Sequence, residues 1–427
     1  MSPEPEELAA PSVRTLLIMS VPAILIGVVS ALFLWTLEQL AALLQQALWE
    51  GIPDALGISQ SSPWLTIGIL TVTGLAVGLV VRFVPGHAGP DTASTELDTP
   101  PPSVRVVPSI ALAVILSLAG GVSLGPENPI LAINAAIAVA VCARFIKVIP
   151  PRMAILFAMA GTLGALFGTP VAAALVLTGT VAAVRGGGSL WDKLFLPVAS
   201  AGAGAVTMHL LGAPPFAFSV PAYPGPSAID LLTGFAIAAV SAGLGILAAI
   251  AFPYIHRAFH ALRSPILFTT LGGLILGILG VIGGPLTLFK GLEQTGELIA
   301  NSEDYTAGQL AMFTIVKVVA LVVAASAGFR GGRIFPAVFV GVALGLCANA
   351  LFPSIPIGLA IACGAMGIVL LATRDGWIAL FIGIALTQDL TLLPILCIIV
   401  LPTWLLVTKA PRLTVPVLGP PKGSTDS

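Results

Sequence analysis

The fold is decided by the stretch Gly120-Gly121-Val122-Ser123-Leu124-Gly125-Pro126-Glu127-Asn128-Pro129, which precedes an apolar run from Ile130 to Val141. Gly125 allows the chain to turn, and Pro126 has a φ angle that suits the first helical turn and no N–H group to leave unpaired. Glu127 then falls in the first turn, where the helix dipole favours a carboxylate. The stretch predicts a helix start that is either an anion site at membrane depth or an acidic cap at the water interface.

The composition is typical of a membrane protein. Of the 427 residues, 57% are hydrophobic and only 9% are charged, whereas soluble domains carry about 25% charged residues. The formal net charge of −1, with scattered Lys and Arg residues, gives no basic surface for nucleic acid. Four cysteines stand singly and without a CxxC pattern, and we expect them as small core residues: Cys142, Cys347, Cys363 and Cys397.

Apolar stretches recur between Thr15 and Thr408. A membrane span needs about 20 residues, and four stretches meet that length: Thr15–Trp35, Leu65–Val84, Ile229–Ala251 and Ala307–Ala327. Four others are too short for a clean span: Ile130–Val141, Met153–Phe167, Pro170–Val184 and Gly376–Leu386. Helices that end inside the membrane are tolerated only around a protein-lined or watery cavity, which favours a transporter or channel over a simple anchor.

A proline-rich loop from Leu211 to Ala228 divides the chain into halves of similar size, residues 15–212 and 228–412. Each half contains a glycine-rich break that opens a helix, which indicates an internal repeat with a site at the interface. The pattern alone leaves inverted and parallel repeats open. Residues 1–14 are acidic and lack the basic region of a signal peptide, so we expect a cytoplasmic tail before a retained first helix. Residues 413–427 are expected to be a short tail, too short for a soluble domain.

Three motifs follow one another along the chain, and each is expected at a helix start: Gly86-His87-Ala88-Gly89-Pro90-Asp91, Gly125-Pro126-Glu127-Asn128-Pro129 and Gly331-Gly332-Arg333-Ile334-Phe335-Pro336. In order and spacing they resemble the patterns GSGIP, GREGP and GxFxP of the CLC family of chloride channels and proton-coupled chloride transporters. The resemblance covers roughly residues 15 to 412. The variants look most like a bacterial branch of ion-transport proteins in that family.

The resemblance implies an all-α polytopic membrane protein in which two inverted halves contain helices broken at membrane depth. It also implies a homodimer with one pore in each subunit. Glu127 takes the place of the gating glutamate, whose carboxylate occupies an anion site until it is protonated or displaced. The residues that it places around the anion are His87, Gly125, Pro126, Arg333, Ile334 and Phe335.

Three departures from the family pattern concern the anion and proton routes. His87 replaces the serine of GSGIP, as an imidazole donor to the anion or as an ordinary interfacial histidine. Leu413 stands where a tyrosine normally lines the inner pathway. Thr180 stands where the transporters have a proton-relaying glutamate, and a threonine cannot relay protons as an ionisable group. Passive anion movement is therefore expected.

Other polar residues have competing interpretations. Ser123 lies in a GxSxG pattern, but the preceding run is membrane-helical and no catalytic histidine stands at a readable position, so a polar group near an anion path is favoured over a hydrolase nucleophile. His256 and His260 have the i, i+4 spacing of metal ligands, although no carboxylate or cysteine accompanies them in the sequence, and an interfacial helix face is favoured. Asp389 and Lys317 are charged residues in apolar runs, either functional or structural.

The sequence predicts a CLC-type protein that moves chloride or another small anion passively across a bacterial inner membrane, as a lipid-embedded homodimer. A proton-coupled chloride antiporter is the alternative within this class, and an intramembrane serine hydrolase is the alternative from another class. Arg330 and Arg333 beside the third motif either attract anions or act as positive-inside anchors. The pattern implies no enzyme activity, cofactor, metal or nucleic-acid partner.

Overall fold

A computed structural model describes residues 12–95, 99–182, 189–213, 216 and 218–415, and the side chain of Thr180 lies outside the described part. In these residues the protein is helical, and its only β-type pairing is one isolated bridge. The first half contains α1 (Val13–Gln46), α2 (Ile52–Leu56), α3 (Pro63–Phe83), α4 (Val107–Ala119), α5 (Glu127–Phe145), α6 (Pro151–Phe167), α7 (Pro170–Ala182) and α8 (Leu190–Leu210). The second half contains α9 (Ala228–His260), α10 (Pro265–Gly283), α11 (Leu292–Ala300), α12 (Ala307–Ser326), α13 (Ile334–Leu351), α14 (Ile357–Thr373), α15 (Gly376–Thr387) and α16 (Leu393–Thr408).

The predicted helices are present with adjusted ends. In the described residues, eight helical segments are long and apolar enough to cross a membrane, and shorter apolar helices such as α6, α7 and α15 lie among them. The first span extends well beyond the expected Thr15–Trp35 to form α1. The run predicted as Ile130–Val141 is also longer, because α5 begins at Glu127 and ends at Phe145.

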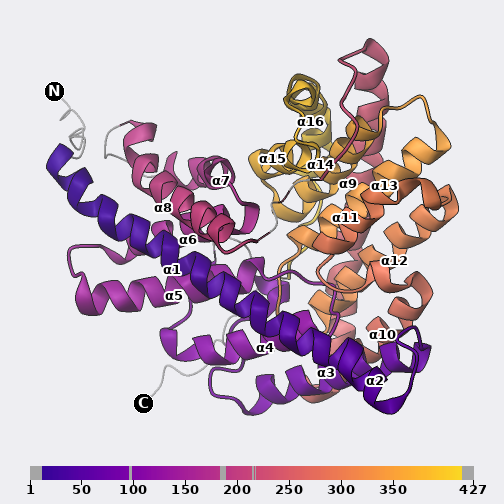
Figure 1. Cartoon of the computed structure of the whole chain (residues 1–427), viewed down its shortest axis with the longest axis horizontal. Coiled ribbons are helices and arrows are strands. Elements are labelled where there is room, and N and C mark those ends of the chain that lie inside the picture. Colours follow the sequence, from indigo (N-terminus) through magenta and orange to yellow (C-terminus); the bar gives the residue numbers. More distant parts are fainter. Residues whose placement is uncertain (1–11, 96–98, 183–188, 214–215, 217, 416–427) are drawn as a thin grey trace, which may run out of the picture.

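Most of the first half lies to the left in Figure 1 and the second half to the right, but α2 and α3 of the first half lie beside α10 at the lower right. Helices α5 to α8 occupy the left side and α9 to α16 the right, while α1 runs diagonally across the view. The halves are joined where α3 packs along α10. Gly74 and Gly273 permit this contact, because a Cβ at either position would lie 2.2–2.3 Å from a carbonyl oxygen of the facing helix. Small residues at such crossings are typical of membrane helices.

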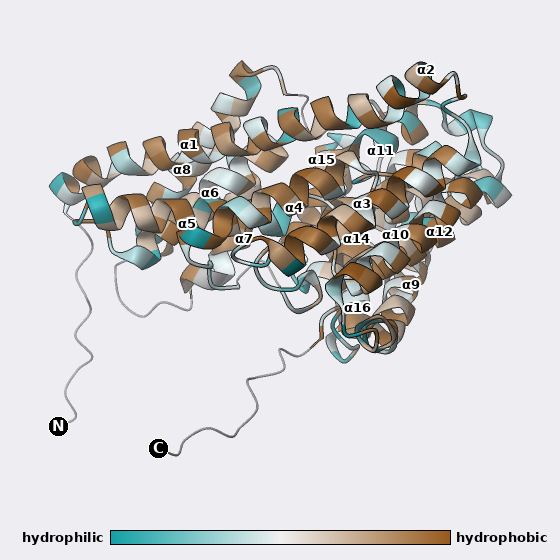
Figure 2. Cartoon of the chain, turned by 90° about the horizontal axis from the view of Figure 1, so that it is seen from below, coloured by the Kyte–Doolittle hydropathy of each residue, from teal (hydrophilic) through white to brown (hydrophobic). Residues whose placement is uncertain are grey.

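The outer surface of the helices is apolar, as the brown ribbons of Figure 2 show. On α1 the exposed side chains include Val13, Leu17, Val21 and Leu25, each more than half exposed. Leucine and valine side chains on the surface of a soluble protein would form an aggregation-prone patch. In a bilayer the same face contacts lipid tails, so the exposed apolar surface agrees with a multi-pass membrane protein.

The first motif does not open an α-helix, contrary to the expectation from sequence. After α3 ends, the motif forms a turn that leads into one short 3-10 helix, Thr92–Ser94, and the next α-helix begins only at Val107. Three consecutive prolines at positions 100–102 lie between them. Because proline lacks the N–H that a helix needs and restricts the residue before it, the chain cannot continue as a helix here.

Candidate functional site

The helix starts predicted at the second and third motifs are confirmed, and they meet inside the protein. α5 begins at Glu127 and α13 begins at Ile334. The chain just before each helix is joined to the other by the isolated antiparallel bridge between Gly125 and Gly332. The N–H of Gly125 donates to the carbonyl of Gly332 at 2.9 Å, and the N–H of Gly332 donates back to the carbonyl of Gly125. Two helix N-termini, each with a positive dipole end, therefore converge on one point.

The Glu127 carboxylate lies at this point and is completely buried. Its Oε1 accepts a hydrogen bond of 2.8 Å from the backbone N–H of Phe335, in the first turn of α13. Its Oε2 has no hydrogen-bond partner among the described residues. The carboxylate thus occupies a backbone anion site of the kind expected at a helix N-terminus, with one oxygen unsatisfied.

Two glycines form the space around the carboxylate. A Cβ at Gly332 would lie 1.8 Å from Oε2 of Glu127, and a Cβ at Gly125 would lie 2.4 Å from the same atom. Neither Gly125 nor Pro126, both predicted to bind the anion, offers a free backbone donor in this conformation. The N–H of Gly125 is used in the bridge, and proline has none. Gly125 and Pro126 therefore leave space for the carboxylate and do not donate hydrogen bonds to it.

The arginines of the third motif turn away from the carboxylate. Arg333 is the N-cap residue of α13, but its guanidinium donates to the carbonyl of Thr92 and lies over the ring of Phe252. Arg330 is also buried, and its guanidinium donates to the carbonyls of Ala88 at 2.9 Å and Gly328 at 2.8 Å. Both side chains fasten the loop of the first motif to the third motif. At Arg333, Ile334 and Phe335, only the backbone faces the predicted anion site, and the Phe335 N–H is the donor that the structure identifies.

His87 does not accompany Glu127, contrary to the interpretation as an anion donor. Its side chain is exposed, whereas the carboxylate is buried. The backbone of His87 has a positive φ of 51°, and its ring Nδ1 is 2.9 Å from the carbonyl oxygen of Val81. This local hydrogen bond turns the imidazole back onto the end of α3, so the side chain is not among the groups that surround the gate position.

Of the two positions predicted to line the inner pathway, Leu413 and Thr180, the structure describes the side chain of Leu413. Leu413 is buried and lines a hollow beside Ile334 and three arginines, Arg333, Arg374 and Arg412. Thr180 belongs to α7, but its side chain lies outside the described residues. The hollow at Leu413 gives a cationic approach to the start of α13, which suits the entry of an anion.

A second hollow, which the sequence did not predict, is lined by an ion pair. Lys290 forms a 2.8 Å ion pair with Glu38 of α1, and both residues line this hollow together with Phe289. Lys290 and Glu38 are close enough to Glu127 to interact with it electrostatically. The sequence carries no signal that Glu38, Glu127 and Lys290 lie near one another, because these three residues belong to separate segments.

A cluster of phenylalanines was also missed. The ring of Phe335 lies 6.2 Å from that of Phe167 and 5.9 Å from that of Phe216, centroid to centroid. Phe167 in turn contacts Phe381 at 5.5 Å. The residue whose N–H holds the carboxylate therefore carries a side chain that is packed among aromatic rings. Such a cluster excludes water and keeps the first turn of α13 rigid.

The polar residues with competing interpretations now have clear environments. Ser123 is buried, and its hydroxyl donates to the carbonyl of Thr287 at 3.2 Å. Lys317 is buried too, and its Nζ donates to the carbonyls of Thr287, Leu288 and Phe289 at 2.8–3.0 Å. Neither residue approaches a histidine or a carboxylate in any described contact. Both hold the turn that precedes Lys290, so their roles are structural.

Asp389 caps a short helical turn. Its carboxylate accepts from the N–H and hydroxyl of Thr391, at 2.9 and 2.6 Å, and from the N–H of Tyr223 at 2.8 Å. These hydrogen bonds, with that of the Thr391 hydroxyl the largest, hold the pKa of the Asp389 carboxyl below its ordinary value. The structure thus favours the helix-end cap over a functional acid.

The cysteines are free, as expected, but one is not in the core. Cys142, Cys347 and Cys363 are buried, whereas Cys397 is exposed on α16. The face of α16 that carries Cys397 is apolar, so exposure here means contact with lipid.

The sequence indicates no carboxylate with His256 and His260, and this is wrong in the folded protein. Asp91 of the first motif contacts both rings.

Comparison with known proteins adds to this geometry. Residues 73–406 match the family described as voltage gated chloride channel. The chain belongs to the CLC family of voltage-gated chloride channels. Proteins called YfeO, described as ion-transport proteins, are 46% identical to it over 408 residues in Escherichia coli strain HS (O9:H4) and in a K12 strain. These matches cover 95% of this chain and 96% of each relative.

Solved CLC structures share the fold. A slow cyanobacterial Cl⁻/H⁺ antiporter matches with a TM-score of 0.77 and 17% identity, covering 95% of this chain and 97% of its own. A CLC-type fluoride/proton antiporter matches with a TM-score of 0.67 and 19% identity, covering 94% of this chain and 98% of its own. The fold is therefore the CLC fold of two inverted repeats, and this CLC protein is a multi-pass membrane protein of an anion-transporting family.

Proposed function

We propose that this CLC protein carries chloride across the bacterial inner membrane, passively, through a pathway that Glu127 gates. One observation carries the proposal, namely that the Glu127 carboxylate occupies the backbone donor at the start of α13. A carboxylate and a chloride ion are both small monovalent anions, so they compete for the same N–H group and the same helix dipole. Chloride is the anion proposed because the family is described by it.

The Glu127 carboxylate is suited to leave its position at the Phe335 N–H. Only one of its oxygens is hydrogen-bonded among the described residues, and an unsatisfied buried oxygen costs about 1–3 kcal/mol, and more when it is charged. Protonation removes the charge that the helix dipoles attract, so acid pH favours release of the side chain. An anion that arrives at Phe335 favours release as well, because it takes over the donor.

Basic residues support an anion route to this position. Lys290 lines one hollow, and Arg333, Arg374 and Arg412 line the other. Cationic side chains at the mouths of a low-dielectric pathway raise the local concentration of anions. The hollow lined by Arg333, Arg374 and Arg412 also includes Ile334, the first residue of α13 and the neighbour of Phe335, whose N–H holds the Glu127 carboxylate.

The passive mode rests on the missing proton route. An antiporter needs a chain of ionisable groups that reaches the gate separately from the anion. Thr180 cannot serve as one, and Asp389, which was the other candidate acid, is engaged as a helix cap. A proton-coupled chloride antiporter remains the second candidate, favoured by the fold shared with the cyanobacterial Cl⁻/H⁺ antiporter.

Purified protein in chloride-loaded liposomes distinguishes the two, with chloride and proton movement recorded together. We expect an imposed chloride gradient to drive chloride efflux that is faster at acid pH and no uphill proton movement. Glu127→Gln and Glu127→Ala are expected to flatten the pH dependence. Glu303→Gln is the matched control, because Glu303 is an exposed acid. Uphill proton movement that Glu127→Gln abolishes would establish the antiporter instead, and an unchanged pH response would refute the gate.

We also propose that the protein is a homodimer embedded in lipid. The support is the family resemblance, together with apolar helix faces too extensive for an aqueous surface. Single-molecule photobleaching of labelled protein in liposomes measures the number of subunits. Two bleaching steps are expected at high lipid dilution, and one step throughout would refute the dimer.

A further inference from the structure

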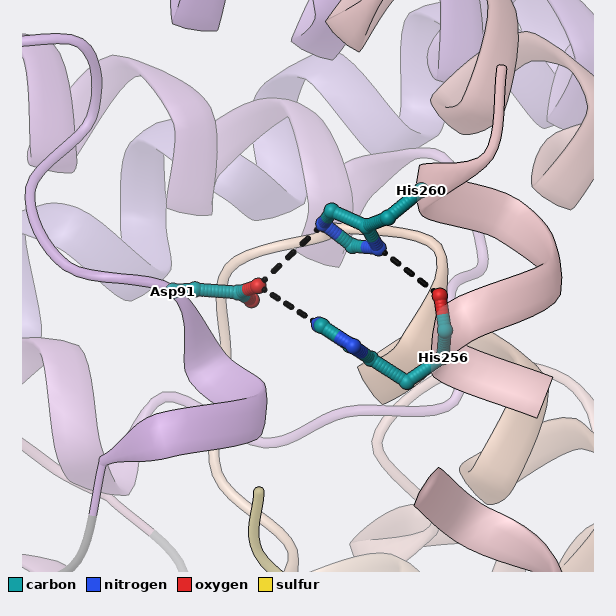
Figure 3. Close-up of side chains that lie close together, drawn as sticks. All are labelled: Asp91, His256 and His260. Atoms are coloured by element: carbon teal, nitrogen blue, oxygen red, sulfur yellow. Dashed lines mark hydrogen bonds and ion pairs between the residues drawn. The ribbon is translucent and has the colours of Figure 1, made fainter. Parts of the chain in front are cut away.

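A cluster of three metal-ligating side chains lies at the end of α9, outside the gate. Nε2 of His256 is 3.1 Å from Oδ2 of Asp91, and Nε2 of His260 is 3.5 Å from the same oxygen. Figure 3 shows both imidazoles directed at this carboxylate, which comes from the loop of the first motif. The three ligand atoms all lie within 4.8 Å of one another. The side chains are 15–32% exposed, so the cluster is formed by the fold and still reached by solvent.

The two carboxylate oxygens of Asp91 have different partners. Oδ1 accepts from the backbone N–H of Ala93 at 3.1 Å and lies 3.7 Å from Nη1 of Arg330. Oδ2 is left for the two imidazoles. Because Oδ1 is held by Ala93 and Arg330, the carboxylate is oriented with Oδ2 toward both imidazoles, as a metal-ligating carboxylate would be.

The hydrogen bond on the other side of His260 fixes its tautomer. Nδ1 of His260 is 3.0 Å from the carbonyl oxygen of His256, and only a protonated nitrogen can meet a carbonyl at that distance. In a neutral ring, Nε2 then carries the lone pair, and it is the nitrogen that a metal ion would bind, 3.5 Å from Oδ2 of Asp91. A backbone carbonyl on the far nitrogen is also the usual outer support of a metal-bound histidine.

We propose that Asp91, His256 and His260 form a binding site for a divalent transition-metal ion of the zinc class. Zinc binds His nitrogen and carboxylate oxygen at about 2.0–2.2 Å with tetrahedral angles, which places neighbouring ligand atoms roughly 3.3–3.5 Å apart. The observed separations from Asp91 are close to that value. Two imidazoles and one carboxylate favour zinc over the hard cations calcium and magnesium, which prefer oxygen alone. Three protein ligands leave the fourth position for water.

An ion here fastens the first-motif loop to α9. The same loop supports the segment before α13, because the Ala88 carbonyl accepts from Arg330 and the Thr92 hydroxyl accepts from the N–H of Gly331. The loop that carries Asp91 is therefore connected by one hydrogen bond to Arg330 and by one to Gly331, the residue next to Gly332. Binding is nevertheless a claim separate from transport, and it is tested without any measurement of flux.

Isothermal titration of zinc into full-length, tag-free protein, stripped with a chelator, tests the site. We expect one ion per chain, and cobalt in its place is expected to give the absorption of a tetrahedral ion. His260→Gln and Asp91→Asn should each weaken binding at least roughly 10- to 100-fold, the loss known for weaker, outer-shell changes. Gln and Asn keep polar groups of similar shape, and gel filtration confirms that the variants remain folded.

His209→Ala is the matched control, because His209 is exposed on α8, away from the cluster. It is expected to bind zinc as the wild type does. The proposal is overturned if wild type and the His256→Gln/His260→Gln double variant bind equally, or if His209→Ala removes the bound ion. It is also overturned if wild-type protein binds no zinc and the cluster only takes up protons at acid pH.

Discussion

Gly332→Ala is expected to open the gate without touching Glu127. The added Cβ would lie 1.8 Å from Oε2 and 2.7 Å from Cδ of Glu127, and the three atoms nearest to it all belong to that side chain. Because carbon and oxygen atoms in contact need roughly 3.5 Å, the carboxylate must leave. It then loses the hydrogen bond from Phe335. A hydrogen bond to a charged group contributes about 1.5–3 kcal/mol, which favours the bound carboxylate roughly 10- to 150-fold, and the clash must exceed this preference to displace the side chain.

Chloride efflux from liposomes measures this effect. Gly332→Ala should raise the efflux rate at neutral pH and flatten its pH dependence, as loss of the carboxylate would. In a Glu127→Gly background no side-chain atom remains at position 127 for the new methyl group to contact. Adding Gly332→Ala to that variant should therefore leave its chloride efflux rate unchanged. Gly308→Ala is the control, because a Cβ there meets nothing within 4 Å. If Gly332→Ala abolishes efflux in both backgrounds while the protein stays folded, the methyl group blocks the path and the reasoning fails.

Three further predictions concern polar residues to which the structure gives a structural role. Lys317→Met leaves the carbonyls of Leu288 and Phe289 without their donor, whereas that of Thr287 keeps the Ser123 hydroxyl, so a loss of about 2 kcal/mol in unfolding free energy is expected, measured as a fall in Tm in detergent. Ser123→Ala removes one neutral hydrogen bond, so about 1 kcal/mol is expected with chloride efflux intact, and lost efflux would contradict a structural role. The folded-state pKa of Asp389 is lowered, so its contribution to stability is present above its unfolded pKa of about 3.9 and lost as the pH falls through the folded value. Wild-type Tm should therefore fall more steeply than that of Asp389→Asn between about pH 5 and pH 3, and parallel curves would rule out the cap as the source.

Local sequence patterns predicted the helix starts of the site. The glycine and proline residues before Glu127 and Ile334 act within a few positions, so their effect can be read without the fold. The start of a helix after Asp91 was predicted in the same way and is wrong. The run of prolines at 100–102 decided the outcome instead, because each removes a helical hydrogen bond.

The groupings in space could not be read from sequence, because each depends on segments that only the fold brings together. Asp91 stands in a motif and His256 on a helix with ligand spacing, yet nothing in the sequence places one beside the other. Lys290 and Glu38 likewise belong to a loop and to α1. For His87 the structure favours the interfacial histidine over the anion donor, since a turn with φ of 51° and a hydrogen bond to Val81 direct its ring outward.

The bridge between Gly125 and Gly332 has a consequence for how the protein is made. A ribosome completes Glu127 and delivers its helix to the membrane long before Phe335 has been synthesised. During that interval the carboxylate lacks the only backbone donor that α13 supplies, and an ionised acid in a bilayer is costly. The first half must therefore insert with this side chain protonated or held near water. Only the second half supplies the Phe335 N–H for this acid, so a chain that stops early leaves a buried carboxyl group without that donor.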